Sequence, residues 1–216
     1  TDMAFVEPMQ FLTEQISNDD AETIAGLIEV HARPGMLAVE LGTYTGRSAL
    51  AMLPTIAREN GTLVCVDWFR GNVGVEAEIG PSYRQHDIQQ ILRENLASAG
   101  HLDRVTLIVG ETVGAATVLA DRSVDVLFVD ADHRYSAVRA DLAAWLPKMK
   151  PGALVFGHDF EAHLRDLDPG HVEAHCEEDF VNGQHLGVIR AVCERFPDVQ
   201  RTGRMWWTIL PTTLQI

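Results

Sequence analysis

Apolar residues recur along this chain in two different patterns, and their alternation predicts the fold. Short apolar runs of six or seven residues, bounded by turn residues, indicate buried strands. Between them lie longer segments with apolar positions three and four residues apart, as in the stripe Ile24, Leu27, Ile28 and His31. Because strand and helix alternate, the pattern predicts an α/β fold: a Rossmann-like parallel sheet with helices on both faces.

The predicted strands are residues 36–41, 62–67, 104–110, 124–130 and 153–159. The predicted helices are residues 20–35, a helix from about Gly46, and residues 83–100, 112–121, 134–149 and 185–199. Pro54 should kink or shorten the second helix, because proline lacks an amide hydrogen. Residues 160–184 are acidic, rich in His and poorly periodic, and predict an irregular insertion. Residues 199–210 predict a tight hairpin, which gives the sheet a terminal antiparallel edge.

No composition shift, linker or internal repeat divides the 216 residues, so we expect a single domain over 1–216. Within it, residues 1–20 form an N-terminal segment, and the insertion 160–184 is expected to be a lid over the substrate. The start, TDMAFVEPMQ, lacks the pattern of a signal peptide. No apolar run is long enough to span a membrane.

Composition limits the partners. The formal net charge of −14 argues against a nucleic acid or an anionic membrane as partner, and favours a small molecule. The three cysteines, Cys65, Cys176 and Cys193, are odd in number and lack metal-site spacing. A reduced, cytoplasmic compartment fits them best.

Polar residues follow almost every predicted strand. In a parallel sheet the carboxyl ends of the strands share one edge, where ligands bind. We therefore expect one site at that edge. The residues at or just past the strand ends are Glu40, Asp67, Glu111, Asp130, His158 and Asp159.

The stretch VELGTYTGRSAL (39–50) places glycines in a turn between a strand and a helix. Glycines allow the backbone to approach a ligand, and a helix N-terminus offers free N–H groups, although an ordinary turn would also fit. Asp67 comes 21 positions after Gly46, where a carboxylate can accept both hydroxyls of a ribose. Trp68 either stacks on an adenine or covers the sheet edge. The candidate ligands of the turn itself are Gly42, Thr43, Tyr44, Gly46 and Ser48.

These motifs, with GET (110–112), VDADHRY (129–135) and KPGALVFGHD (150–159), together resemble the class I S-adenosylmethionine-dependent methyltransferases. The resemblance covers roughly residues 20–210, including the terminal hairpin. Residues 124–160 are similar to small-molecule O-methyltransferases of the catechol and caffeoyl-CoA type, and more so to bacterial enzymes that methylate sugars and natural products.

The resemblance implies S-adenosylmethionine as cofactor, a hydroxylated small molecule as acceptor, and a homodimer. It also implies that Glu40 lies near the methionine amino group and that Asp67 holds the ribose. Glu111 and Thr112 would lie near the adenine, and Asp130 would also border the cofactor.

The ends of strands four and five depart from the pattern of these relatives. The relatives carry a metal-binding Asp followed by a catalytic Lys, and here the same register gives Asp130 and His133. At the next strand end they carry Asp-Asn or Asp-Asp, where this chain has His158 and Asp159. Mg²⁺ prefers oxygen ligands, so a His ligand favours Mn²⁺, Fe²⁺ or Zn²⁺. Otherwise His158 serves as a base with no metal.

His133 is the expected general base, because imidazole titrates near neutral pH. We expect it in the first turn of a helix, where the helix dipole would keep the ring neutral. The alternative is a ring that packs at the sheet edge against Asp132. Asp132 itself is expected to cap the helix. The pair His171 and His175, in HVEAH, has the spacing of a metal site on a helix.

Two other classes of function compete with methyl transfer. A nicotinamide-dependent oxidoreductase would need Gly-x-Gly-x-x-Gly, and the first turn has only Gly42 and Gly46. A non-catalytic protein that binds S-adenosylmethionine would not need the polar residues at the ends of strands four and five.

Overall fold

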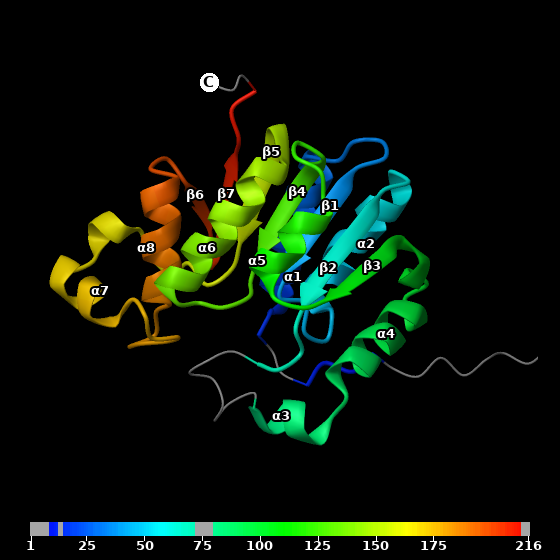
Figure 1. Ribbon diagram of the computed structural model, residues 1–216, viewed down its shortest axis with the longest axis horizontal. Helices are drawn as coiled ribbons and strands as arrows, with labels where there is room; N and C mark the ends of the chain where they lie inside the picture. The colour runs from blue at the N-terminus through cyan, green and yellow to red at the C-terminus, as the bar shows by residue number, and fades with distance from the viewer. Residues whose placement is uncertain (1–8, 13–14, 72–79, 213–216) are drawn as a thin grey trace, which may run out of the picture.

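A seven-stranded, mostly parallel sheet forms the centre of the computed structural model (Figure 1), which describes residues 9–12, 15–71 and 80–212. The strand order is β3-β2-β1-β4-β5-β7-β6. The parallel strands are β1 (Leu37–Leu41), β2 (Thr62–Asp67), β3 (Val105–Val109), β4 (Val124–Val129) and β5 (Met149–Gly157). β7 (Met205–Ile209) pairs antiparallel with β5, and β6 (Gln200–Thr202) pairs antiparallel with β7. The predicted fold class, with its terminal hairpin, is confirmed.

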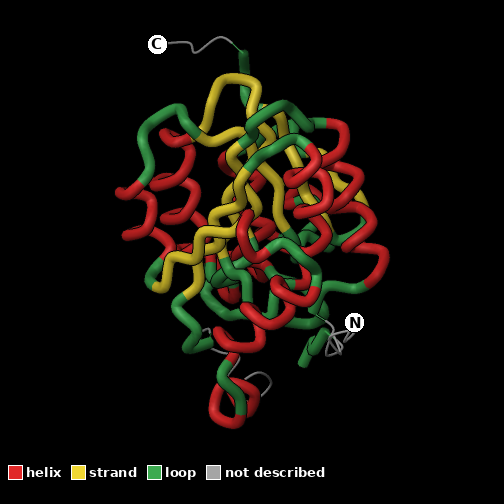
Figure 2. The backbone as a smooth tube through the Cα atoms, turned by 90° about the vertical axis from the view of Figure 1, so that its right-hand side faces the viewer, coloured by secondary structure: helices red, strands yellow, loops and turns green. Residues whose placement is uncertain are grey.

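Helices cover both faces of the sheet (Figure 2). One apolar core lies between the sheet and α1 (Asn18–Val30), α2 (Arg47–Arg58) and α4 (Ile88–Ser98). The other lies under α5 (Thr112–Ala115), α6 (Tyr135–Trp145) and α8 (Leu186–Arg195). α3 (Gly80–Gln85) and α7 (Pro169–His175) are short additions. Because the central strands are buried on both faces, their apolar runs are nearly continuous.

Several predicted boundaries were wrong for local reasons. The segment predicted as one helix over 83–100 is broken after Gln85, because the Asp87 side chain accepts the N–H of Gln90 and starts α4. α2 continues through Pro54 to Arg58, with the proline on the exposed side of the helix. The segment 112–121 contains only the short α5 and a 3₁₀ turn.

The insertion 160–184 is more regular than predicted, because it contains a 3₁₀ turn and α7. Val172 and Cys176 pack with Leu186 in a small separate core, which fixes α7 against α8. His31 lies just past the end of α1 and is only partly buried, so it is not a core residue. Among the described residues, no helix has the length and apolar character needed to cross a membrane.

Candidate active site

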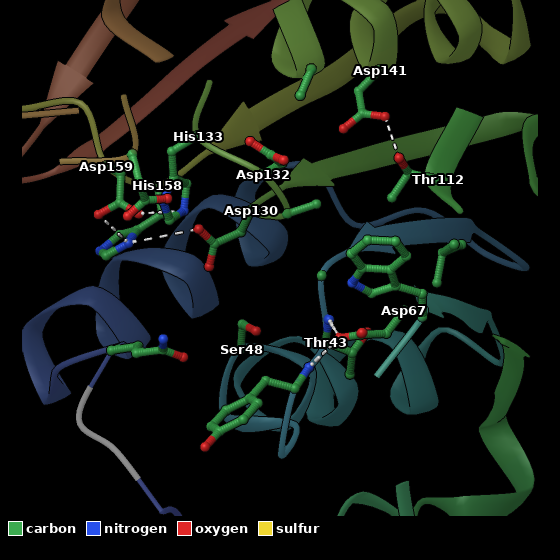
Figure 3. Close-up of a pocket in the computed structure, with 18 of the residues that line it drawn as sticks. Thr43, Ser48, Asp67, Thr112, Asp130, Asp132, His133, Asp141, His158 and Asp159 are labelled. Carbon is green, nitrogen blue, oxygen red and sulfur yellow. Dashed lines mark hydrogen bonds and ion pairs between the residues drawn. The ribbon is translucent and has the colours of Figure 1, made fainter. Parts of the chain in front are cut away.

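A cavity of about 570 Å³ opens at the carboxyl ends of the parallel strands (Figure 3). It is bordered by nine of the predicted cofactor residues, namely Gly42, Thr43, Tyr44, Ser48, Asp67, Trp68, Glu111, Thr112 and Asp130. The predicted catalytic and metal residues His133, His158 and Asp159 border the same cavity. The expectation that the strand ends converge on one site is therefore correct for these positions.

The glycine turn between β1 and α2 passes very close to the end of β4. Gly42 has φ = +82°, and a Cβ atom there would lie 2.1 Å from the main-chain oxygen of Asp130. Only glycine fits that conformation and that space. Gly42 therefore sets how closely the two strand ends approach each other under the cavity floor.

Asp67 holds the glycine turn from the end of β2. Its Oδ2 accepts the N–H groups of Thr43 at 3.0 Å and Tyr44 at 2.8 Å, and its Oδ1 accepts the N–H of Phe69 at 2.7 Å. Burial raises the pKa of the Asp67 carboxyl, and these backbone hydrogen bonds oppose the rise. Asp67 thus shapes the turn in addition to bordering the cavity.

Two predicted cofactor residues, Glu40 and Gly46, are not among the residues that line the cavity, and their contact with a cofactor stays a prediction. Glu40 is fully buried and accepts a hydrogen bond from the Ser48 hydroxyl. Burial raises the pKa of Glu40 to about 7. Through its hydrogen bond Glu40 orients the hydroxyl of Ser48, which borders the cavity. Gly46 is the left-handed residue that begins α2, and it faces Leu92 of α4.

Asp141 is a site residue that the sequence reasoning missed. It borders the cavity from α6, is 2% exposed, and accepts a hydrogen bond from the Thr112 hydroxyl. Burial raises the pKa of Asp141 to about 7. The Trp145 indole N–H donates to the Thr112 carbonyl at 3.0 Å. The sequence did carry a signal for Asp141, because its carboxyl group lies on the apolar face of α6 beside Val138.

Asp130 directly follows β4 and borders the cavity. Burial raises the pKa of its carboxyl to about 6, with the nearby His158 opposing the rise. Its Oδ1 lies 3.9 Å from Nδ1 of His158. A carboxyl with a pKa near 6 can accept a proton at neutral pH.

His158 lies between two carboxylates. Its Nδ1 is 3.1 Å from Oδ1 of Asp159, and its Nε2 is 3.2 Å from Oδ2 of Asp20, without the geometry of a hydrogen bond in the latter case. Burial disfavours the imidazolium, but Asp159 and Asp20 outweigh it and raise the pKa of His158 to about 10. Asp20, which also forms a capping box with Ser17 at the start of α1, was not predicted as a site residue.

His133 does not lie in the first turn of a helix, and the expectation of a neutral ring was wrong. α6 begins at Tyr135, and the His133 ring lies between Asp159 and Asp179. Its Nε2 is 3.1 Å from Oδ2 of Asp159, and its Nδ1 is 2.9 Å from Oδ1 of Asp179. Burial lowers the pKa of His133, but the two carboxylates raise it well above its usual value. Direct ion pairs dominate over any helix dipole.

Asp132 forms a turn rather than a helix cap. Its Oδ1 accepts the N–H of Arg134 at 2.9 Å, and its carboxylate pairs with the Arg134 guanidinium at 2.6 Å. The cap position of α6 is Arg134. His171 and His175 lie on α7 with their rings 4.7 Å apart, and His175 pairs with Glu178 at 2.7 Å. In the described part of the chain neither belongs to a group of converging metal ligands.

The predicted metal ligands Asp130, His158 and Asp159 do converge. One potential ligand atom from each lies within 4.8 Å of the other two. The Asp20 carboxylate beside the far nitrogen of His158 is the kind of outer contact that orients a metal-binding imidazole. The set of one nitrogen and two carboxylates fits Mn²⁺, Fe²⁺ or Zn²⁺ better than Mg²⁺.

Comparison with known proteins gives the family. Residues 39–160 match the model of a family described as a methyltransferase domain, and this match covers more than half of the chain. The chain belongs to this family, and the resemblance to class I S-adenosylmethionine-dependent methyltransferases is confirmed. The uncharacterized protein y4gI of Sinorhizobium fredii is 30% identical over 139 residues, or 63% of this chain. The chain spans only 14% of that relative's length.

Solved structures share the fold. Cofactor-bound Rv0187 from MTB is 18% identical, with a TM-score of 0.61 over 95% of this chain and 84% of its own. The O-methyltransferase TomG of Streptomyces achromogenes, in complex with SAM, is 19% identical, with a TM-score of 0.59 over 90% and 81%. SAH-bound PaMTH1 of Podospora anserina is 17% identical, with a TM-score of 0.64 over 92% and 80%.

Proposed function

We propose that the protein transfers a methyl group from S-adenosylmethionine to a hydroxyl group of a small molecule. One observation carries the proposal. A single cavity runs from the glycine turn and Asp67 to Asp130 and the His–Asp cluster, so a cofactor and an acceptor can meet at Asp130. Family membership and the cofactor-bound structural relatives support this reading.

In this proposal the cofactor occupies the β1–β3 side of the cavity. Asp67 accepts the hydrogen bonds of the ribose hydroxyls. Thr112 and Glu111 face the adenine, and the Trp68 ring stacks on it. The methionine part lies over Gly42 and near Ser48. Asp141 adds a carboxyl group beside Thr112 that can pair with a polar edge of the adenine.

We assign the proton transfer to Asp130 rather than to His133. A hydroxyl is a poor nucleophile until its proton leaves, and the carboxylate of Asp130 borders the cavity where the two parts meet. The hydroxyl oxygen attacks the methyl carbon, the carbon–sulfur bond breaks, and the proton passes to Asp130. The products are the methyl ether and neutral S-adenosylhomocysteine. His133 lies between Asp159 and Asp179 and keeps Asp159 in place.

A divalent metal is an extension of this proposal. Asp130 through Oδ1, His158 through Nδ1 and Asp159 would hold it. Such an ion would lower the pKa of an acceptor hydroxyl and fix its oxygen. The segment 160–184 would act as the lid, since Asp179 and the exposed ring of Phe180 border the cavity.

The test begins with binding. S-Adenosylhomocysteine should raise the melting temperature of the protein, and NAD should not. Transfer of a labelled methyl group from S-adenosylmethionine to a panel of phenols, sugars and hydroxylated natural products then tests catalysis. Stabilisation by NAD alone would favour an oxidoreductase. Binding of S-adenosylhomocysteine with no transfer to any acceptor would favour a non-catalytic binding protein.

A further inference from the structure

A tight hairpin inside the insertion brings Asp179 and His185 together. Val181 and Gln184 exchange two main-chain hydrogen bonds, of 2.9 and 3.0 Å. Between them Asn182 and Gly183 have φ values of +51° and +84°, the left-handed pair that a two-residue hairpin turn requires. Phe180 and His185 then lie opposite each other, with their rings 4.8 Å apart.

Main-chain packing places the segments on either side of this hairpin against the loop that carries His133. The N–H of Tyr135 donates to the carbonyl of Cys176 at 2.8 Å. At the start of α8, a Cβ atom on Gly187 would lie 2.3 Å from the carbonyl oxygen of His133. The two segments are therefore fixed to each other by contacts that leave no room for a side chain at Gly187.

The result is a cluster of two imidazoles and a carboxylate. One potential ligand atom from each of His133, Asp179 and His185 lies within 4.8 Å of the other two. The two imidazole rings are 4.6 Å apart, and all three side chains are at most 15% exposed. A metal site with two His ligands, one carboxylate and open positions for water suits Zn²⁺, Fe²⁺ or Co²⁺. It does not suit Mg²⁺.

The outer contacts of both rings match those of metal-binding histidines. His133 places Nδ1 toward Asp179, and its other nitrogen, Nε2, is 3.1 Å from Asp159. His185 gives Nδ1 to Glu161 at 2.8 Å, and Glu161 also accepts the main-chain N–H of His185. Imidazoles that bind a metal usually donate their second N–H to a carboxylate in this way.

We propose that His133, Asp179 and His185 form a second metal site, for a borderline transition-metal ion, separate from the set Asp130, His158 and Asp159. Ligands of a tetrahedral Zn²⁺ are roughly 3.3 Å apart, for metal–ligand bonds of about 2.0 Å. The 2.9 Å between Nδ1 of His133 and Oδ1 of Asp179 needs only a small expansion to reach that value. An ion here would add a further link between the hairpin of the insertion and the loop after β4, beside the cavity that all three residues border.

The charges around the cluster also favour a cation. Five carboxylates contact the imidazoles of His133 and His185 or that of the neighbouring His158. They belong to Asp20, Asp130, Asp159, Glu161 and Asp179. In the described residues the guanidinium paired with this group is that of Arg204, which contacts Asp159 and Glu161. A divalent cation bound here would offset part of this negative charge.

The experiment is a titration of the chelator-treated, full chain with Co²⁺, followed by visible absorption and by calorimetry. The wild-type chain should bind Co²⁺ at this site, and Asp179→Asn and His185→Asn should each weaken that binding at least tenfold. Asp130→Asn should leave this binding unchanged and remove only binding at the other set. His175→Ala, on the neighbouring α7, is the matched control and should bind as the wild type does.

Unchanged Co²⁺ binding by both Asp179→Asn and His185→Asn would overturn the proposal, as would loss of all binding in Asp130→Asn alone. A chain that binds no Co²⁺ at millimolar concentration overturns it too. Hydrogen exchange of the wild-type chain with and without Zn²⁺ keeps the test valid if a variant misfolds. Protection should appear in residues 177–187, and protection confined to other segments would contradict the site.

Discussion

At the β1–β2 side of the cavity the groups that set the geometry are largely main-chain atoms, whereas at the β4–β5 side they are charged side chains. On the first side, Asp67 gathers the N–H groups of Thr43, Tyr44 and Phe69 within a few residues of two strand ends. On the second side, His133 and His158 are held by carboxylates from α1, the end of β5 and the insertion.

This difference predicts that the two sides of the cavity are disrupted by different kinds of substitution. Main-chain geometry is sensitive to volume, because a Cβ atom cannot be accommodated where backbones touch. An ion-pair cluster is sensitive to charge, because removing one partner leaves the other buried and unpaired. Substitutions that change the volume of a side chain without its charge, or its charge without its volume, therefore distinguish the two sides.

Gly42→Ala should cause the largest loss, because Gly42 is where the two sides meet. The added Cβ atom would lie 2.1 Å from the Asp130 carbonyl oxygen, at φ = +82°. We expect the free energy of unfolding in urea to fall by about 3 kcal/mol or more. Gly35→Ala is the control, since it has φ = +68° but no atom within 4 Å, and should cost only about 1–2 kcal/mol. Equal losses would show that the close approach is unimportant.

Glu40 should make the folded protein less stable as the pH rises. Its pKa is raised from 4.5 to about 7 by burial, so the folded state prefers the protonated form. The stabilising effect is therefore complete below about pH 4.5 and is lost as the pH rises to about 7, by about 3 kcal/mol. Glu40→Gln should reduce this part of the pH dependence in urea unfolding measured from pH 5 to 8. An unchanged pH profile would contradict a protonated Glu40.

Asp130→Asn should lower kcat about a hundredfold or more, because the amide cannot accept the hydroxyl proton. The affinity for S-adenosylhomocysteine should stay within about twofold of the wild type, since the expected loss is at the acceptor end. Asp132→Asn, two residues along the same loop, should change kcat much less. Equal losses in the two variants would mean that the loop's charge matters, and that Asp130 is not the base.

Asp67→Ala should weaken the binding of S-adenosylhomocysteine tenfold or more, because a charge-assisted hydrogen bond is worth about 1.5–3 kcal/mol. Asp67→Asn keeps the size of the side chain and one accepting oxygen, so its affinity for S-adenosylhomocysteine should fall less. Calorimetry gives both affinities. Unchanged affinity in the alanine variant would remove the proposed ribose contact.

Much of this architecture could be read from local sequence. The strands and the glycine turn follow from patterns spanning about ten residues, and polar residues at parallel strand ends must share one edge. That is why Asp67, Asp130, His158 and Asp159 were placed at the cavity correctly. The hairpin around Asn182 and Gly183 also has a local signal, because an Asn-Gly pair is typical of a two-residue hairpin turn.

Local sequence patterns predicted the alternation of strands and helices along the chain, the sheet edge that carries the site, and the family. The raised pKa values of His133 and His158, in contrast, depend on the tertiary structure. The pKa of His133 depends on Asp179, 46 positions away, and that of His158 depends on Asp20 at the other end of the chain. The local pattern of apolar and polar residues indicates which face of a helix or strand a residue occupies. The charge that it carries depends on which distant groups fold against it, because electrostatic interactions act through space rather than along the chain.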